Sequence, residues 1–390
     1  MRRQAVLYFA SVYWDDPLIT PQQIALQLAR RFDILYVEPS PCAPYFRDAG
    51  RNRRWLKAGR SLARVADGLT VYSPPPMLPL KTRVPLFNLV SQRWVRPFVR
   101  RAAASLGLER PVLFTYLPHL HVTAGTYDER AVCYYCIDDM GALTRVIDPA
   151  VVGGFERALL AKTDLVFTTS RGLQARLSAR HRDVRLVPNG SDPDLYAAAL
   201  APETPVAPDL SGMPPPVLGY SGLLDYRVDQ DLIAEVARRR PGWSFVFVGP
   251  VRTPVSRLDA LPNVRFVPSQ AQGALPSFFK GFTVALIPYA IGPMVRFIYP
   301  TKLNDYLGAG LPVIATMLPE LEACPADIVS RVSGPDEFIA AVERLAPSRA
   351  DRVAVAARVV YARDNSWERR AALIADAIEA RLAEGPTCAS

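Results

Sequence analysis

The chain has 390 residues, half of them hydrophobic and 21% charged, and its formal net charge is +9. This length suits two domains of about 150 to 200 residues, and the composition excludes a disordered chain. Five scattered cysteines exclude a disulfide framework, and no apolar run approaches the roughly 18 residues of a membrane span. We therefore expect a globular protein in the reducing setting of the cytoplasm.

The first half of the chain alternates short apolar runs with amphipathic helical patterns. Strands are predicted at 4–10, 33–38, 69–73, 111–116, 131–137, 164–169 and 184–188. Helices are predicted at 21–31, 84–106, 149–162 and 171–180. Strands separated by helices indicate parallel β-α-β units.

A proline-rich segment at 199–216 predicts a linker, after which the alternation restarts. Strands are predicted at 217–221, 243–249, 264–267, 282–288 and 312–316, and helices at 229–239, 272–280, 300–309, 335–346, 349–362 and 366–384. The sequence thus predicts a first α/β domain over 1–198 and a second over 217–375. The C-terminal helix and tail, 376–390, are expected to cross back to the first domain.

Positive charge is concentrated in the first half of the chain. Residues 1–190 carry a net charge of +12, whereas the remainder carries −3, and 47–101 alone holds 13 basic and 2 acidic residues. Arginines alternate there with Trp55, Leu56, Trp94 and Phe98. Basic and aromatic residues on a helix face favour the surface of an anionic membrane. The alternatives are a solvated basic face and, without any recognisable nucleic-acid module, a nucleic-acid surface.

The segment 299–316 reads as a helix followed by a buried strand. Pro300 suits the first helical position, Gly310 and Pro312 end the helix, and an apolar strand follows. Lys302 lies in the first turn, where a cation opposes the helix dipole unless an anion such as a phosphate joins it. Asp305 shares its face. The pair suits a nucleotide, with the lysine on the diphosphate and the aspartate on a ribose hydroxyl; a plain surface pair is the alternative.

This segment resembles the nucleotide-binding helix of bacterial group 1 type glycosyltransferases with the GT-B fold, in particular those of teichuronic acid and exopolysaccharide assembly. Matching stretches in the same order are Leu35 to Pro39, Tyr134 to Asp139, Pro188-Asn189-Gly190, Gly219 to Gly222, and Ser366-Trp367. The resemblance implies two doubly wound Rossmann-like domains facing a cleft. It places a nucleotide-sugar donor on the second domain and the acceptor on the first.

Donor-binding candidates follow from these motifs. A small turn lets backbone N–H groups approach a phosphate, and an arginine offers it a bidentate fork. The candidates are Tyr220, Ser221, Gly222, Arg227, Thr301, Lys302 and Asp305. Because cationic side chains and backbone N–H groups can stabilise the departing diphosphate, we expect neither a metal nor another cofactor.

The catalytic base is predicted in the first domain. Many relatives carry two glutamates eight positions apart, the second on the nucleotide-binding helix, but here Phe297 occupies the first position. The segment 137–141 is similar to the base-carrying stretch of xanthan-type glucuronosyltransferases, which places the base on Asp139, with Asp138 as second choice. Helix capping and simple loop polarity are the alternatives. The reserve candidates are Asp15, Asp16, His119 and His121.

The combined hypothesis is a glycosyltransferase peripheral to the inner face of the plasma membrane. It would transfer a sugar from a nucleoside diphosphate such as UDP to a lipid-linked or polysaccharide acceptor. Two rival hypotheses are a nucleotide-sugar epimerase of the same fold and a non-catalytic relative that binds nucleotide or lipid.

Overall fold

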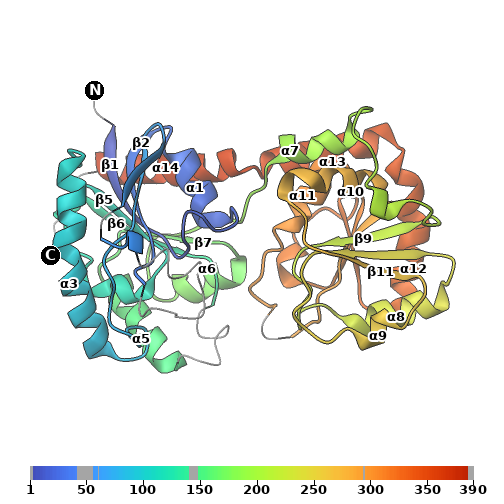
Figure 1. Ribbon diagram of the computed structural model, residues 1–390, viewed down its shortest axis with the longest axis horizontal. Helices are drawn as coiled ribbons and strands as arrows, with labels where there is room; N and C mark the ends of the chain where they lie inside the picture. Colours follow the sequence, from blue (N-terminus) through green and yellow to red (C-terminus); the bar gives the residue numbers. More distant parts are fainter. Residues whose placement is uncertain (1–2, 42–55, 60, 140–147, 293–294, 385–390) are drawn as a thin grey trace. The chain divides into compact units, whose positions relative to one another are not determined.

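The chain folds into two compact units, which we describe separately. The computed structural model describes residues 3–41, 56–59, 61–139, 148–292 and 295–384. Unit 1 comprises residues 1–188 and 370–390, and unit 2 comprises 189–369. Each unit contains one β-sheet flanked by helices (Figure 1).

The sheet of unit 1 is almost entirely parallel. Its strand order is β3-β4-β2-β1-β5-β6-β7-β8, and only β3 and β4 pair antiparallel. The strands are β1 (Gln4–Phe9), β2 (Phe32–Val37), β3 (Leu62–Ala66), β4 (Leu69–Tyr72), β5 (Val112–Thr115), β6 (Ala131–Cys136), β7 (Leu165–Thr168) and β8 (Val184–Leu186). The helices are α1 (Thr20–Leu28), α3 (Pro85–Ser105), α5 (Pro149–Leu160), α6 (Arg171–Ser178) and the 3-10 helix η1 (Pro118–Val122).

The central strands of unit 1 form its core because helices cover both faces of a parallel sheet. All residues of β5 and β6 are buried, and Tyr8 of β1 stacks on Phe114 of β5 with ring centroids 4.9 Å apart. The continuous apolar runs in the sequence therefore correspond to strands that are buried on both sides.

Unit 2 contains a fully parallel sheet with the order β11-β10-β9-β12-β13-β14. Its strands are β9 (Val217–Ser221), β10 (Ser244–Val248), β11 (Val264–Val267), β12 (Val284–Ile287), β13 (Val313–Thr316) and β14 (Val329–Val332). Helices α7 (Pro193–Ala197), α10 (Leu275–Gly281), α11 (Lys302–Gly308) and α13 (Arg352–Asp364) contact one another, as do α8 (Gln230–Arg239), α9 (Ser256–Asp259) and α12 (Pro335–Leu345). These two groups cover opposite faces of the sheet (Figure 1). The 3-10 helices are η2 (Ala198–Leu200), η3 (Pro208–Leu210), η4 (Gln272–Ala274), η5 (Pro319–Leu321) and η6 (Ala346–Arg349).

Each sheet has one point at which the strand order reverses. In unit 1 this point lies between β1 and β5, and in unit 2 it lies between β9 and β12. In doubly wound sheets the connections leave such a point in opposite directions, which opens a crevice at the carboxyl ends of the strands. The predicted α/β, doubly wound fold class is confirmed, and each unit has one favoured place for a ligand.

The C-terminal helix α14 (Trp367–Ala383) belongs to both units. Its first turn lies in unit 2, and from Arg370 onward it belongs to unit 1. Arg31 forms ion pairs with Asp376 and Glu379, and Arg381 binds Asp164 at 2.8 Å. The C-terminal helix therefore completes the first sheet unit.

The proline-rich segment 199–216 is packed against unit 2. It contains η2 and η3, and Ala207 and Leu210 are buried in the hydrophobic core of this unit. The Asn189-Gly190 motif also has a structural role there, since the Asn189 carbonyl accepts a hydrogen bond from Asn304. A Cβ atom on Gly190 would approach the Trp367 backbone to 2.7 Å, so this turn requires close backbone contact.

Several predicted elements differ from the structure. Helix α11 begins at Lys302, two residues later than predicted, because Pro300 and Thr301 form the preceding turn. Strands β3 and β14 were absent from the prediction: β3 is an exposed edge strand, and β14 is short and contains serine and arginine. The basic face expected around Arg64 is therefore partly a strand, while residues 42–55 and Arg60 lie outside the described residues.

Candidate functional site

The predicted donor-binding residues gather at the strand-order reversal of unit 2. Ser221 ends β9 and Gly222 follows it, Tyr289 follows β12, and Lys302 begins α11. Because parallel strands all end on one edge of the sheet, the loops after β9 and β12 meet beside this helix. The geometry thus collects residues that are as many as 81 positions apart in the sequence, Ser221 and Lys302.

Lys302 is held between two tyrosine rings. Its Nζ donates a hydrogen bond of 2.6 Å to the Tyr289 hydroxyl, and it lies 4.9 Å and 5.0 Å from the ring centroids of Tyr220 and Tyr289. Burial alone would lower the pKa of Lys302, but Tyr220 and Tyr289 outweigh it and raise this pKa above its usual value. The ammonium group consequently stays charged at neutral pH, as an anion-binding site requires.

Two glycines let the backbone pass close to this lysine. Gly222 has φ of +127°, and a Cβ atom there would lie 3.4 Å from Lys302 Cε. Gly249, after β10, has φ of +145°, and a Cβ atom on it would lie 2.2 Å from the Gly222 carbonyl oxygen. Both backbone conformations strongly favour glycine. The Gly222 loop therefore runs directly beside the ammonium group, where a ligand can contact both.

The Tyr306 hydroxyl fixes the end of β9 against α11. It accepts a hydrogen bond of 2.7 Å from the Ser221 N–H, and the Tyr306 ring is fully buried. The Tyr220 hydroxyl donates to the Leu223 carbonyl at 2.8 Å, which closes the turn that follows. The Tyr306 hydroxyl thus positions the glycine loop, a role that the sequence did not predict.

Arg227 also lies near the Tyr289 ring, with its guanidinium carbon 6.0 Å from the ring centroid. Its guanidinium contacts both carboxylate oxygens of Asp225. Arg227 Nη2 lies 2.8 Å from Asp225 Oδ2, and the Nε–H group donates a hydrogen bond of 2.9 Å to Oδ1. Asp225 is buried, which would raise its pKa, but Arg227 lowers the pKa below its usual value. Arg227 is therefore oriented beside Lys302, although its charge is shared with a carboxylate.

Asp305 lies one turn further along α11. Burial, the largest effect, raises the pKa of Asp305 to about 7, although Lys302 and the Tyr196 hydroxyl both lower it. Tyr196, on α7, also accepts a hydrogen bond of 3.1 Å from Gln272. The carboxyl group therefore titrates near neutrality in a polar niche, where it can accept a hydrogen bond from a ligand hydroxyl.

Two neighbouring positions contribute less to this arrangement. Thr301 is exposed, has a helical backbone conformation and makes no side-chain capping bond to α11. Phe297, at the position where a carboxylate was expected, lies with its ring 5.7 Å from the Arg296 guanidinium carbon.

In unit 1, Asp138 and Asp139 follow β6. The Asp138 carbonyl accepts a hydrogen bond from the Cys136 thiol at 3.4 Å, and Asp139 contributes electrostatically to the raised pKa of Arg176. Residues 140–147 lie outside the described residues, so the segment after this pair is not part of the site geometry. The pair stands at the carboxyl end of a buried strand, as the sequence predicted.

A buried polar cluster beneath this strand end was missed by the sequence analysis. Glu156 of α5 accepts two hydrogen bonds from Arg176 of α6, at 2.7 Å and 3.0 Å, and another of 3.0 Å from Tyr134. Burial raises the pKa of the Cys136 thiol beside it to about 12, which makes this cysteine unreactive. The only sequence signal was a glutamate on the buried face of an otherwise apolar helix.

The reserve candidates lie in two places: Asp15 and Asp16 follow β1, and His119 and His121 belong to η1. Asp15 pairs with Lys57 at 3.6 Å on the surface, and Asp16 accepts a hydrogen bond from the Tyr13 N–H. His121 stacks on Phe155 with ring centroids 4.9 Å apart. Contacts of this kind are typical of side chains with a structural role.

His119 lines a small cavity in unit 1, and burial lowers its pKa to about 3, with Lys81 and His121 lowering it further. An imidazole with such a pKa binds protons too weakly to be an efficient base at neutral pH. Within the described ranges, no group of three or more histidine, cysteine, aspartate or glutamate side chains is arranged to hold a metal ion.

Comparisons with known proteins agree with this arrangement. Residues 227–376 match a family model described as glycosyl transferase-like. A Bacillus subtilis protein described as the teichuronic acid biosynthesis glycosyltransferase TuaH is 28% identical over 283 residues, which cover 68% of this chain and 70% of that protein.

Solved structures extend the similarity to the whole chain. Sucrose-phosphate synthase from Thermosynechococcus elongatus superimposes with a TM-score of 0.68 and 15% identity, over 98% of this chain and 100% of that one. An Escherichia coli trehalose-6-phosphate structure bound with UDP-2-fluoro glucose gives a TM-score of 0.65 and 11% identity, over 97% and 99%. The fold is therefore GT-B, and the sequence similarity is to glycosyltransferases, over residues 227–376 for the family model and over 283 residues for TuaH.

Proposed function

We propose that the protein transfers a sugar from a nucleoside diphosphate sugar to a lipid-linked or polysaccharide acceptor in cell-surface polysaccharide synthesis. The observation that carries this proposal is the Lys302 ammonium group, kept charged beside the Gly222 loop at the strand-order reversal of unit 2. The Escherichia coli structure named above holds a UDP-sugar, and TuaH is described as a glycosyltransferase, which supports this donor class and this pathway. No feature favours the epimerase or the non-catalytic alternative.

In this mechanism the donor diphosphate lies against Lys302 beside the Gly222 loop, with Arg227 next to it. The bond between the anomeric carbon and the diphosphate oxygen breaks, and negative charge develops on the departing diphosphate. A fixed cation in a site of low dielectric constant stabilises that charge without reorganising. Asp305 accepts a hydrogen bond from a ribose hydroxyl and so orients the nucleoside.

The acceptor hydroxyl attacks the anomeric carbon and forms the new glycosidic bond. Its proton passes to Asp139 acting as general base, and Asp138 is the second choice. The ion pair of Arg176 and Glu156 lies beside this strand end, where Glu156 also binds Tyr134 of β6. A base of this kind suits inverting transfer.

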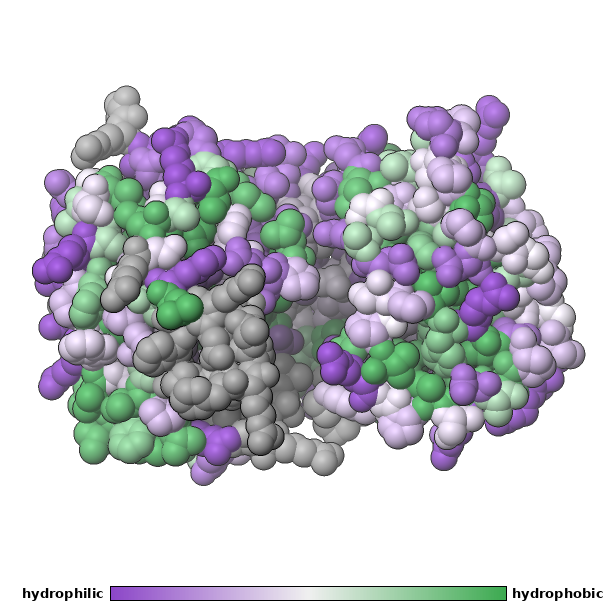
Figure 2. Space-filling model, in the orientation of Figure 1, coloured by the Kyte–Doolittle hydropathy of each residue, from purple (hydrophilic) through white to green (hydrophobic). Residues whose placement is uncertain are grey.

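We also propose that α3 holds unit 1 on the inner surface of an anionic membrane. Leu86, Val90 and Trp94 recur every fourth residue and are 62%, 48% and 55% exposed, which places an apolar stripe on the solvent side of the helix. Exposed arginines follow it at positions 93, 100 and 101. Figure 2 shows hydrophobic surface gathered over the end of this helix beside α5. Apolar residues with basic neighbours fit the interface of an anionic bilayer.

Membrane attachment would be peripheral. None of the helices in the described parts of the chain combines the length and apolar composition that crossing a bilayer takes.

The nucleotide site is tested by replacing Lys302 with alanine. Loss of a charge-assisted contact of about 1.5–3 kcal/mol should weaken UDP binding by about tenfold to a hundredfold. Calorimetry with UDP, GDP and their sugar conjugates measures this change and identifies the base. Arg352→Gln, which removes an exposed charge from the same unit, should bind as wild type does. Equal affinity in the wild type and Lys302→Ala would refute the site.

Asp305 should make donor binding depend on pH. Because its pKa is raised to about 7, the carboxyl group is mostly neutral at pH 6 and mostly ionised at pH 8. The ionised form is the better acceptor for a ribose hydroxyl, so affinity for UDP-glucose should increase about three- to tenfold over this range. Titrations of UDP-glucose, whose diphosphate has no proton to lose near neutrality, should show the rise in wild type and a flat profile in Asp305→Asn. A rise of the same size in the variant would contradict the assignment.

The base is tested by Asp139→Asn. Removing a general base should lower kcat by about a hundredfold or more, while UDP binding on unit 2 stays unchanged. Sugar transfer from the donor identified by calorimetry into bacterial lipid extract measures kcat. Asp138→Asn should reduce it far less. Wild-type turnover in Asp139→Asn would exclude this residue.

Membrane association is tested by flotation with phosphatidylglycerol-rich vesicles at low salt. Wild type should float with these vesicles, and the triple change of Leu86, Val90 and Trp94 to serine should abolish flotation because the apolar stripe is lost. The matched control replaces Val353 and Val360, exposed apolar residues of α13, and should float normally. Absence of flotation in wild type would remove the membrane proposal and leave the transferase proposal intact.

A further inference from the structure

Tyr289, which follows β12, has a hydroxyl group at the centre of the candidate donor site. The residue is 4% exposed, and its oxygen accepts the 2.6 Å hydrogen bond from Lys302 Nζ. The mechanism above gives this hydroxyl no part in the reaction itself. Its surroundings nevertheless favour a direct contact with the substrate.

The backbone around Tyr289 is held by neighbouring segments, so its side chain has a defined position. The Tyr289 carbonyl accepts a hydrogen bond of 2.7 Å from the Thr316 hydroxyl at the end of β13. The Ala290 N–H donates to the Arg227 carbonyl at 2.7 Å, and Tyr289 forms an antiparallel bridge with Val228. A hydroxyl placed in this way needs no reorganisation when charge develops beside it.

Two cationic side chains lie next to Tyr289. Lys302 donates to its hydroxyl, and the guanidinium carbon of Arg227 lies 6.0 Å from its ring centroid. Burial alone would raise the pKa of Tyr289, but Lys302 and Arg227 outweigh it and lower this pKa below its usual value. Neighbouring positive charge polarises the phenol O–H bond, and a hydrogen bond from it to an anion is charge-assisted.

The Tyr289 hydroxyl retains its own proton for a ligand. Within the parts of the chain that the structure describes, no hydrogen bond has this hydroxyl as its donor. The neighbouring Tyr220 hydroxyl donates instead to the Leu223 carbonyl. A buried O–H group without an acceptor is destabilising, so the arrangement favours a ligand oxygen as the missing acceptor.

We propose that Tyr289 is a catalytic residue whose hydroxyl donates a hydrogen bond to the diphosphate oxygen that leaves the sugar. This inference deepens the proposed transfer reaction and rests on it. The bond between the anomeric carbon and that oxygen breaks, its electron pair stays on the oxygen, and Tyr289 keeps its proton. The hydrogen bond is therefore weak to the ester oxygen of the bound donor and strong to the charged oxygen of the departing diphosphate. A contact that strengthens in this way accelerates the reaction.

Tyr289→Phe tests the hydroxyl alone, because the ring beside Lys302 remains. UDP carries the charged oxygen and UDP-glucose carries the ester oxygen, so calorimetry with both ligands at about pH 8, where the terminal phosphate is ionised, separates donation from positioning of Lys302. The variant should lose about tenfold or more in affinity for UDP and less than about threefold for UDP-glucose. The corresponding GDP pair replaces these ligands should calorimetry identify guanine as the base.

Binding of UDP-glucose also shows that Tyr289→Phe is folded. The matched control is Tyr226→Phe, which removes an exposed hydroxyl from the same unit and should bind both ligands as wild type does. Equal losses for the two ligands in Tyr289→Phe would indicate a purely structural role and overturn the proposal. Unchanged affinity for UDP would overturn it as well.

Turnover gives a second measurement. Tyr289→Phe should lower kcat by about tenfold or more and change the KM for the donor by less than about threefold, because the lost bond forms fully only as the diphosphate departs. A raised KM with unchanged kcat would assign Tyr289 to donor binding alone and contradict the catalytic role.

Binding by the wild type separates this inference from the proposed function. If neither UDP nor GDP binds the wild type, the transferase proposal itself fails. If UDP binds the wild type and Tyr289→Phe equally, the donor site stands and only the catalytic role of Tyr289 fails.

Discussion

A single geometric constraint positions the chemistry of this protein: parallel strands all end on the same edge of their sheet. Each unit uses this edge at the point where its strand order reverses, between β9 and β12 in one and between β1 and β5 in the other. Loops from distant parts of the sequence meet there, and each unit presents a lysine at that place. The position of the candidate donor site in unit 2 follows from this arrangement.

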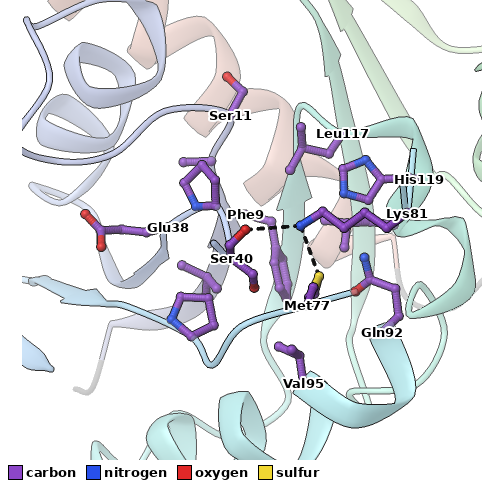
Figure 3. A pocket seen from close by; sticks show the side chains of 15 residues that line it. Phe9, Ser11, Glu38, Ser40, Met77, Lys81, Gln92, Val95, Leu117 and His119 are labelled. Atoms are coloured by element: carbon purple, nitrogen blue, oxygen red, sulfur yellow. Dashed lines mark hydrogen bonds between the residues drawn. The ribbon is translucent and has the colours of Figure 1, made fainter. Parts of the chain in front are cut away.

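The two lysines, Lys302 and Lys81, are held in different ways. Lys302 lies between the rings of Tyr220 and Tyr289, so its charge is stabilised by π faces and by one hydroxyl while no carboxylate forms an ion pair with it among the described contacts. A diphosphate can therefore take the ammonium group without breaking a strong ion pair. Lys81 instead lines a small cavity of unit 1 and donates to the Ser40 carbonyl at 3.3 Å (Figure 3).

Buried ion pairs elsewhere in the chain orient these sites. Asp225 holds Arg227 beside the Tyr289 ring, and Glu156 holds Arg176 beneath the end of β6. Such pairs contribute little net stability, because the cost of desolvating two charges offsets their attraction. Their effect is to fix direction, because each carboxylate holds its arginine in one orientation.

The amino-acid sequence by itself determined the class of the fold and most strands of both sheets. Apolar runs of four to six residues between helical patterns indicate strands whose two faces are both buried. It also singled out Lys302 and Asp305, since Pro300 and Gly310 mark the ends of their helix. Local sequence patterns did not predict strands that lack a continuous apolar run, namely the exposed edge strand β3 and the polar strand β14. Only the tertiary structure placed Tyr289 against Lys302, Arg176 against Glu156, and Lys81 in a cavity formed by five separate segments. Such contacts depend on strand order, which periodicity along the chain does not encode.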